Sequence, residues 1–495
     1  MVQNALLPAA NTSLGLALGV APLGHAHTKI VATLGPASER RVGELVEAGM
    51  SVARVNFSHG TSEDHKRRID AVRAVAAERG TPVGVLADIQ GPKLRMGVLE
   101  EHSRALESGE IVVIRAGPGP APRGELCFDF EGALDALQRG HRIFLADGAV
   151  ELETASILGD RLTARVVRGG VVSDRKGVNL PDSAIALELP TPKDRADIEL
   201  ARALGVDVLG ISFVGEAADV RAVRQLAPGM PVIAKIERLA ALSNIDAILA
   251  ESDGIMVARG DLGVEVELEH LPLVQKSLLQ AALRAGKFAI TATEMLESMI
   301  ESSRPTRAEV ADIANAVLDG TDALMLSAET AVGKYPVESV ATMNRIALAV
   351  EHSQRYNDLP RVVFRSSEPT FSNAIALAAT DAAGALKLSK IVCFTETGNS
   401  VRLISRYRPG AEIIALSPHE RTLNAMTLLA HVRPLAFPRL TSLEEMLALA
   451  CERLLERRWV VPGEEVVFVA GVPPGVSRTT NVVKLHRVGE RIDLH

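Results

Sequence analysis

The sequence predicts an α/β protein in which a (β/α)8 TIM barrel carries an inserted small β domain and is followed by an open α/β domain. Apolar runs of strand length alternate with helical patterns eight times from Lys29 onward. That rhythm breaks over residues 97–182, and a change of composition at 357–369 precedes a second set of alternating elements. Strands that alternate with helices form parallel sheets, and eight such units close into a barrel.

The eight predicted barrel strands are rich in apolar and β-branched residues and end at charged residues or turn signals. They lie at 29–34, 51–57, 82–88, 206–213, 231–237, 254–258, 287–293 and 322–327. Apolar residues at helical spacing predict helices between and after them, at 40–48, 62–79, 217–226, 271–284 and 336–352.

Residues 97–182 differ from the barrel segments because their apolar runs are short, alternate with polar residues and are separated by Gly and Pro. Such runs, at 111–115, 141–145 and 161–167, predict a small β domain. Inserted at a barrel loop, this domain would cover the active end of the barrel as a lid. The expected parts are an N-terminal extension at 1–27, a barrel at 28–96 and 183–355, a lid at 97–182 and a C-terminal α/β domain at 356–495.

The C-terminal domain repeats the alternation of helices and strands, which predicts an open α/β sheet. Its predicted helices are 371–386, 400–406, 422–429 and 442–455, and its predicted strands are 390–394, 412–416, 465–470 and 481–486.

Composition excludes several classes of protein. Of the 495 residues, 47% are hydrophobic and 23% are charged, which is enough for several cores. The net charge of -7 leaves no basic footprint for nucleic acid. Three widely spaced cysteines predict a reducing, cytoplasmic setting. The apolar stretch at 14–23 is too short to span a membrane, and no Lys or Arg precedes Lys29 to mark a signal peptide.

Polar and charged residues gather where the predicted barrel strands end. Active sites of such barrels are built at the carboxyl ends of the strands, whereas charges with structural roles would be scattered over both ends. The residues at this rim are Arg54, Asn56, Asp88, Lys235, Glu237, Asp261, Thr293, Ser327 and Glu329.

Lys235 and Glu237 are two residues apart on one strand, so their side chains are expected on the same side. Asp261 follows the next strand along the chain. Two carboxylates beside one ammonium group suit a divalent metal held next to an anionic substrate.

Three loops carry groups that bind anions, although each is also the pattern of an ordinary polar turn or capped helix. Residues 35–38 lead from a strand toward a helix, where free backbone N–H groups can receive a phosphate. Residues 56–60 add amide, hydroxyl and imidazole groups. Residues 395–400 form a hydroxyl-rich turn that opens a helix.

Taken together, these motifs resemble those of pyruvate kinase, in order and with that family's spacing, from Thr28 to near Val488. They are TKIVATLGPAS at 28–38, ARVNFSHG at 53–60, DIQGPKLR at 88–95, GVNLP at 177–181, AKIE at 234–237, VARGDLG at 257–263, TEMLESM at 293–299, RPTRAE at 304–309 and LSAET at 326–330.

The resemblance implies transfer of a phosphoryl group from phosphoenolpyruvate to ADP, which gives pyruvate and ATP in the last step of glycolysis. It implies that Glu237 and Asp261 hold Mg²⁺ or Mn²⁺ and that Lys235 and Arg54 bind the phosphoryl group. It further implies that the amides of Gly260 and Asp261 bind the substrate carboxylate and that Thr293 lies near the protonated carbon. The residues implied in nucleotide binding are Pro36, Asn56, His59, Arg95 and Lys193.

Lys93 departs from the pattern of many family members, which have Glu there and require K⁺. Those members bind K⁺ with residues that match Asn56, Ser58, Asp88 and the carbonyl of Ile89. Because a Lys ammonium supplies one fixed positive charge, Lys93 predicts activity without K⁺.

The resemblance also implies an allosteric homotetramer. In the family, the loop that matches 395–400 binds the phosphate of an activator, with help from 475–480. The domain is similar to that of isozymes that respond to AMP or to monophosphorylated sugars. The implied effector-binding residues are Thr395, Glu396, Thr397, Gly398, Asn399 and Ser400.

Two other classes stay open on the residues alone. A metal-dependent barrel lyase or aldolase that acts on pyruvate would also need Glu237, Asp261 and Arg54, but not the nucleotide motifs or the insert. A non-catalytic sensor that uses the 395–400 loop would be expected to have lost Lys235 or a metal carboxylate. ADP-dependent formation of pyruvate from phosphoenolpyruvate separates the three classes.

Overall fold

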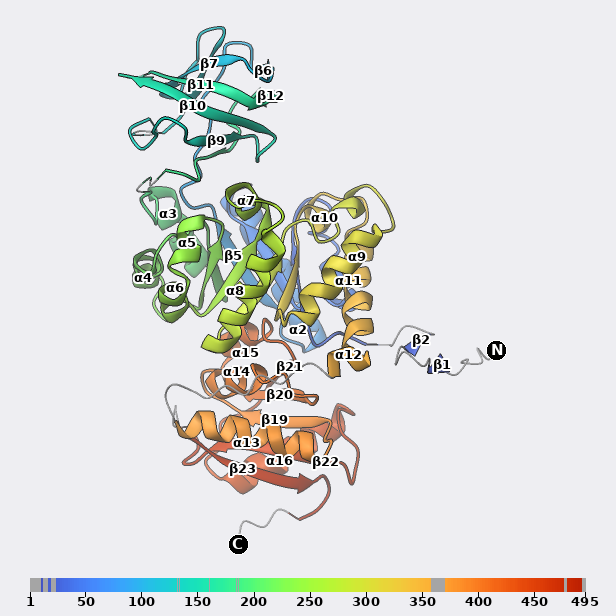
Figure 1. Cartoon of the computed structure of the whole chain (residues 1–495). Helices are drawn as coiled ribbons and strands as arrows, with labels where there is room; N and C mark the ends of the chain where they lie inside the picture. The colour runs from blue at the N-terminus through green and yellow to red at the C-terminus, as the bar shows by residue number, and fades with distance from the viewer. Residues whose placement is uncertain are drawn as a thin grey trace.

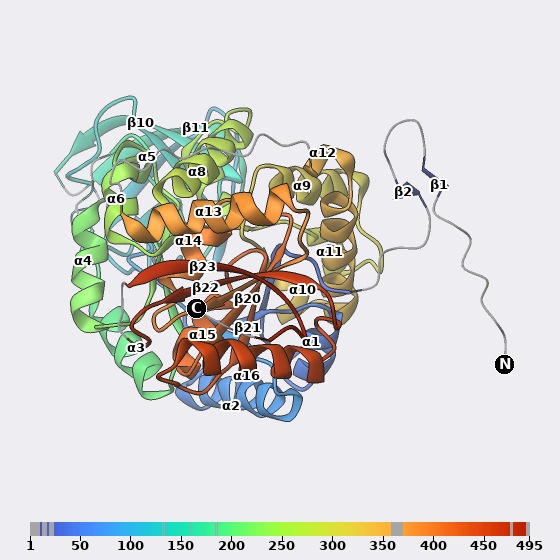
Figure 2. The same cartoon turned by 90° about the horizontal axis from the view of Figure 1, so that it is seen from below.

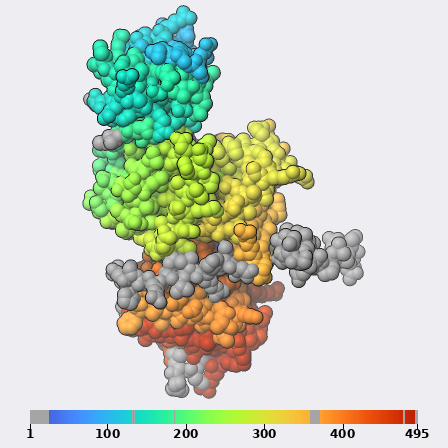
Figure 3. Space-filling view, viewed as in Figure 1, coloured from blue at the N-terminus to red at the C-terminus, as the bar shows by residue number. Residues whose placement is uncertain are grey.

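The computed structural model describes residues 24–130, 132, 134–159, 161–183, 185, 187–357, 370–475 and 479–491, and the backbone of the paired strands β1 (Ala10–Asn11) and β2 (Ala17–Leu18). The predicted extension at 1–27 and the composition change at 357–369 fall mostly outside these residues. Three units stack in one direction, with the insert above the barrel and the C-terminal unit below it (Figure 1, Figure 3).

Eight parallel strands close into a barrel in the order β14-β15-β16-β17-β18-β3-β4-β5, which confirms the predicted fold class. The strands are buried along most of their length because helices cover the outside of the barrel, and the sequence accordingly shows nearly continuous apolar runs. The strands are β3 (Lys29–Thr33), β4 (Val52–Asn56), β5 (Gly84–Ile89), β14 (Val208–Ile211), β15 (Val232–Ile236), β16 (Gly254–Ala258), β17 (Phe288–Ala292) and β18 (Ala323–Leu326).

Several barrel helices begin at signals that are legible in the sequence. Thr61, Thr191 and Thr306 are N-caps of capping boxes, in which the threonine and an acid three residues later satisfy each other's backbone N–H groups. The helices are α1 (Val42–Ala48), α2 (Ser62–Arg79), α3 (Pro192–Ala203), α4 (Ala217–Leu226), α5 (Leu239–Ser243), α6 (Ile245–Glu251), α7 (Arg259–Glu265), α8 (Leu271–Ala285), α9 (Arg307–Leu318), α10 (Ala328–Ala331), α11 (Pro336–Glu351) and α12 (Gln354–Asn357), with the 3-10 turn η1 (Glu297–Ile300).

The insert between β5 and α3 is an all-β unit with its own apolar core. It has a six-stranded sheet in the order β13-β9-β10-β11-β7-β8 and a two-stranded sheet of β12 and β6. Its strands are β6 (Ser103–Leu106), β7 (Ile111–Ala116), β8 (Glu125–Phe128), β9 (Arg142–Leu145), β10 (Val150–Leu158), β11 (Arg161–Arg168), β12 (Gly170–Ser173) and β13 (Val178–Asn179). The domain limits at 97 and 182 stay a prediction.

The C-terminal unit is a five-stranded sheet in the order β21-β20-β19-β22-β23, with β23 antiparallel to β22. Strand β21 was not predicted, because Pro434 interrupts its apolar run; a proline is compatible with the edge position that β21 occupies. The elements are α13 (Phe371–Ala385), β19 (Lys390–Phe394), α14 (Asn399–Ser405), β20 (Glu412–Ser417), α15 (Glu420–Met426), β21 (Val432–Ala436), α16 (Leu443–Glu456), β22 (Glu465–Gly471) and β23 (Thr480–Arg487).

The C-terminal unit lies against the amino ends of the barrel strands, opposite the insert (Figure 2). Three aspartates stand there, each immediately before a strand: Asp207 before β14, Asp253 before β16 and Asp322 before β18. Each carboxylate accepts the backbone N–H of a residue on or beside a neighbouring strand, at 2.7 to 2.9 Å. These bonds join adjacent strands at the amino end of the barrel, where the backbone hydrogen bonds between the strands begin.

Each of the three aspartates also meets a side chain of the C-terminal unit. Asn424 donates to Asp207 at 3.1 Å, Arg408 pairs with Asp322 at 2.7 Å, and Arg402 lies 3.8 Å from Asp253. Asp207, Asp253 and Asp322, with their three partners, are called the aspartate seat below. The seat fixes the C-terminal unit to alternate barrel strands through polar contacts between distant parts of the chain.

No helix in the described ranges is both long and apolar enough to cross a membrane. The three cysteines are buried and unpaired, so the described chain contains no disulfide.

Candidate active site

A buried ionic cluster lies at the carboxyl end of the barrel, where the sequence predicts the site. The Lys235 ammonium on β15 is 3.0 Å from Glu237 Oε1 and 3.1 Å from Asp88 Oδ1. It also donates to Ser212 Oγ at 2.7 Å. Lys235 and Glu237 therefore lie side by side, as their spacing predicts. Ser212 was not predicted, because nothing in the sequence sets it apart from other serines at strand ends.

Arg54 extends this cluster to the neighbouring strand β4. Its guanidinium pairs with Asp88 Oδ2 at 2.7 Å and donates to Thr33 Oγ1 at 2.9 Å. Asp88 thus contacts two cations with its two oxygens. Burial opposes the charged form of Asp88, yet Lys235 and Arg54 hold the pKa of that carboxyl below its ordinary value. Burial likewise opposes the charge on Lys235, but Asp88 and Glu237 raise the pKa of its ammonium.

Glu237 and Asp261 provide oxygen donors suited to a hard divalent cation. Glu237 is 2% exposed and accepts the Phe213 N–H at 2.7 Å. Burial raises the pKa of Glu237, and Asp261 raises it further although Lys235 opposes the shift. A cation between the two carboxylates would relieve this repulsion, so the residues fit Mg²⁺ or Mn²⁺. Within the described chain no three His, Cys, Asp or Glu side chains form a group that could hold a metal ion.

Gly260 and Thr293 meet beside this carboxylate pair. A Cβ on Gly260 would lie 2.8 Å from Thr293 Cγ2, so glycine is required for the close approach of α7 to the end of β17. Thr293 has φ +74°, a left-handed conformation that is strained for a β-branched residue. Arg259 holds it there by donating to the Thr293 carbonyl at 2.5 Å and pairing with Asp312 at 2.6 Å. Arg259 was missed as a positioning residue, although it lies within a motif.

The predicted nucleotide residues are only partly brought together. Lys193, at the start of α3, donates to the Phe57 carbonyl at 2.9 Å and so reaches the loop that contains Asn56 and His59. The Asn56 side chain accepts the Ser58 N–H at 3.0 Å, which shapes this loop, and His59 is exposed on it.

Pro36 and Arg95 lie on other loops. Pro36 is exposed in the turn after β3. Arg95 stands at the base of the insert, where it donates to the Arg175 carbonyl at 3.1 Å. A bound nucleotide would have to bridge these loops, so their part in binding stays a prediction.

Lys93 contacts Asp261, one member of the carboxylate pair, and one carboxylate of the insert. Its ammonium lies 3.2 Å from Asp261 Oδ1 and 3.7 Å from Asp147 Oδ1 of the insert. Asp88, which belongs to the expected K⁺ group, pairs instead with Arg54 and Lys235.

The other residues of the expected monovalent-cation group have partners in the protein. Ser58 donates its N–H to the Asn56 side chain, and the Ile89 carbonyl accepts the Ser212 hydroxyl at 2.8 Å. K⁺ independence therefore stays a prediction.

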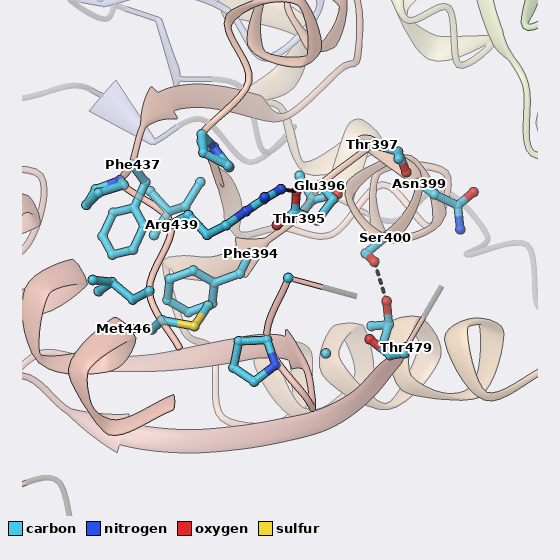
Figure 4. A pocket seen from close by; sticks show the side chains of 18 residues that line it. Phe394, Thr395, Glu396, Thr397, Asn399, Ser400, Phe437, Arg439, Met446 and Thr479 are labelled. Atoms are coloured by element: carbon cyan, nitrogen blue, oxygen red, sulfur yellow. Dashed lines mark hydrogen bonds and ion pairs between the residues drawn. The ribbon is translucent and has the colours of Figure 1, made fainter. Parts of the chain in front are cut away.

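A pocket in the C-terminal unit contains the predicted effector loop, which leads from β19 into α14 (Figure 4). The Gly398 N–H donates to Thr395 Oγ1 at 2.9 Å, and the Ser400 and Thr480 hydroxyls are hydrogen-bonded to each other. Residues 476–478 of the second predicted segment lie outside the described residues. The lining includes Thr395, Glu396, Thr397, Asn399, Ser400, Arg439, Gly475, Thr479 and Thr480.

Glu396 places a carboxylate with two basic partners in this pocket, and these partners were not predicted. Its carboxylate accepts Arg439 at 2.6 Å and His419 at 2.7 Å. Burial opposes its charge, but Arg439 and His419 hold the pKa of Glu396 below its ordinary value. Among the described residues that line the pocket, Arg439 has the one cationic side chain.

The barrel, its ionic rim and the overlying insert define the class: an enzyme whose site lies at the carboxyl end of a (β/α)8 barrel. Comparison with known proteins defines the family. Residues 25–340 match the pyruvate kinase barrel domain, and residues 373–486 match the pyruvate kinase alpha/beta domain. The chain therefore belongs to the pyruvate kinase family and is an enzyme of that class.

Relatives along almost the whole chain agree with this. A pyruvate kinase of Methylorubrum extorquens is 42% identical over 461 residues, which cover 92% of this chain and 96% of the relative. One from Mycobacterium tuberculosis is 41% identical, with 93% and 98% covered. One from Sporosarcina psychrophila is 40% identical, with 94% and 80% covered.

Proposed function

We propose that the barrel rim transfers the phosphoryl group of phosphoenolpyruvate to ADP, yielding pyruvate and ATP as the last step of glycolysis in the cytoplasm. The observation that carries this proposal is the buried cluster of Lys235, Arg54, Asp88 and Glu237 beside Asp261. Phosphoryl transfer needs positioning and fixed charge more than covalent chemistry, and this cluster supplies two cations held rigidly by carboxylates.

The side chains have distinct roles in this proposal. Lys235 stabilises the phosphoryl group in flight, and Arg54 binds its oxygens. The N–H groups of Gly260 and Asp261 hold the substrate carboxylate. Thr293, with water, lies near the carbon that receives a proton. Glu237 and Asp261 would hold Mg²⁺ or Mn²⁺, which would supply positive charge to the anionic substrate.

We propose that ADP enters beside the loop that contains Asn56 and His59. Lys193 supports this because its ammonium already contacts that loop. Pro36 and Arg95 are proposed to reach the nucleotide from the neighbouring loops on either side.

Activity is expected without K⁺, because Lys93 supplies a fixed positive charge next to Asp261. Pyruvate formation in a K⁺-free tetramethylammonium buffer should change by less than about twofold on addition of KCl. Removing Mg²⁺ with a chelator should lower it by about a hundredfold or more. A many-fold rise with KCl would refute the K⁺ prediction, and full activity without divalent metal would refute the metal assignment.

The variant Lys93→Glu sharpens this test. It should lose about tenfold or more of its K⁺-free activity and regain it with KCl, because a monovalent cation would then be needed to balance the new charge. Lys176→Glu is the matched control, because Lys176 is an exposed lysine of the insert and its replacement changes the charge by the same amount. The activity of this control should not change on addition of KCl.

Activation by a monophosphorylated metabolite is expected at the loop formed by residues 395–400. Among the described residues that line the pocket, Arg439 is the one cation, already paired with Glu396, and a second phosphate placed beside it would meet the Glu396 carboxylate. Velocity at subsaturating phosphoenolpyruvate should therefore rise with AMP or a hexose monophosphate, and not with fructose 1,6-bisphosphate. No response to any phosphate ester would refute the proposal.

Two variants locate this response. Ser400→Ala removes a hydroxyl from the pocket and should raise the activator concentration for half-maximal effect by about tenfold. Ser442→Ala removes the N-cap of α16 in the same unit, outside the pocket, and should leave the activator concentration for half-maximal effect unchanged.

We infer a homotetramer, whose two quaternary states would couple the pocket to the barrel. Sedimentation of the same samples should show four chains per particle.

A further inference from the structure

Ser212 connects two parts of the active site, the Lys235 ammonium and the loop that contains Lys93. It follows β14 directly and is 3% exposed. Its hydroxyl donates to the Ile89 carbonyl at 2.8 Å and accepts from the Lys235 ammonium at 2.7 Å. Because the single hydroxyl proton goes to the carbonyl, a lone pair is left facing the ammonium.

The Lys235 ammonium has three N–H groups and three acceptors in the described structure. Two of the acceptors, Asp88 and Glu237, carry charge and have other partners or roles. Asp88 is shared with Arg54, and Glu237 is a proposed metal ligand. Ser212 is the neutral acceptor. It orients the ammonium without neutralising its charge.

Ser212 also fixes the loop that contains Lys93. Gly91 has φ +67°, and a Cβ there would lie 2.6 Å from the Ser212 carbonyl oxygen, so the loop backbone packs directly on Ser212. The Gly91 N–H donates to Asp194 at 3.0 Å, which holds the loop from the other side. The hydroxyl contact with Ile89 therefore joins the Lys235 ammonium to the segment that ends in Lys93.

We propose that Ser212 is a positioning residue for phosphoryl transfer, which holds the Lys235 ammonium in line with the phosphoryl group and in register with the Lys93 loop. This inference rests on the proposed role of Lys235. Ser212 contacts no reacting atom, so its effect is on the geometry of the ammonium. A displacement of such a group by about 1 Å lowers rates by up to a hundredfold.

Steady-state kinetics of Ser212→Ala with saturating Mg²⁺ provide the first test. The kcat should fall by about ten- to a hundredfold, whereas KM for phosphoenolpyruvate and for ADP should change by less than about threefold. Ser339→Ala is the matched control, because Ser339 is equally buried and donates to a backbone carbonyl at 2.7 Å on α11. It should retain kcat within about twofold, while its melting temperature should change about as much as that of Ser212→Ala. Unchanged kcat in Ser212→Ala would overturn the proposal.

A double-mutant cycle with Lys235→Met shows whether Ser212 acts through the ammonium. In that background, adding Ser212→Ala should lower kcat by less than about threefold, because the group it positions is gone. If the full ten- to a hundredfold loss persists, Ser212 acts elsewhere and the inference fails. If Lys235→Met alone retains its activity, the proposed role of Lys235 fails instead, so the two failures are distinguishable.

Discussion

Replacing Lys235 by methionine is expected to lower kcat by about a thousandfold or more. The ammonium is a full charge on a side chain that is 12% exposed and is held by two carboxylates, so its interaction with a developing phosphoryl charge is weakly screened by water. KM for phosphoenolpyruvate should change far less, because Arg54 and the backbone N–H groups of Gly260 and Asp261 remain to bind the ground state. The measurement is ADP-dependent pyruvate formation under saturating Mg²⁺.

The control for this variant is Lys287→Met at the opposite end of the barrel. Lys287 is also partly buried and donates to the Ser252 carbonyl at 2.6 Å, so its loss affects stability. It should retain kcat within about twofold, since it is remote from the rim. A Lys235→Met enzyme that keeps more than a tenth of wild-type kcat would contradict the role assigned to the ammonium.

Replacing Arg408 by leucine is expected to destabilise the aspartate seat by about 3–5 kcal/mol. Arg408 and Asp322 form a buried ion pair, and removal of the cation leaves Asp322, 4% exposed, as an uncompensated charge. Burial opposes the charge on Arg408, but Asp322 raises the pKa of its guanidinium. Arg408 also donates to the Gly320 carbonyl at 2.7 Å, and this bond is lost as well.

Trp459 is the one tryptophan of the chain and lies in the C-terminal unit, so its fluorescence reports the unfolding of that unit in urea. The matched control is Arg453→Leu, because Arg453 forms an exposed pair with Glu456 on α16. Exposed pairs contribute about 1 kcal/mol or less, so the control should unfold close to the wild-type urea concentration. Equal midpoints for both variants would show that the seat does not stabilise the C-terminal unit.

Much of the architecture was predictable because it depends on local patterns. The eight strands are buried apolar runs, and Thr61 marks the start of the predicted helix at 62–79. The helices that begin after Thr191 and Thr306 carry the same signal but were not predicted. The missed strand β21 shows the limit of such patterns. Pro434 argues against a central strand, and only its edge position, set by its pairing with β20 alone, makes a strand compatible with proline.

The residues of the candidate site also divide into those that local patterns predict and those that depend on tertiary contacts. The rim residues Arg54, Asp88, Lys235, Glu237 and Asp261 were predictable because every strand of a parallel barrel ends on the same rim. Their partners were not. Ser212 and Ile89 are 123 residues apart, and Lys93 and Asp261 are 168 residues apart, so their contacts depend on the closure of the barrel and the placement of the insert.

The sequence by itself therefore determined the barrel, the family and the set of charged groups at its rim, because period and motif are properties of neighbouring residues. Only the tertiary structure decided how those charges pair: Lys235 with Ser212, Lys93 with Asp261 and Asp147, and the aspartate seat with the C-terminal unit. The reason is physical. A buried charge takes the partners that the closed fold brings within about 3 Å, and these partners are distant along the chain.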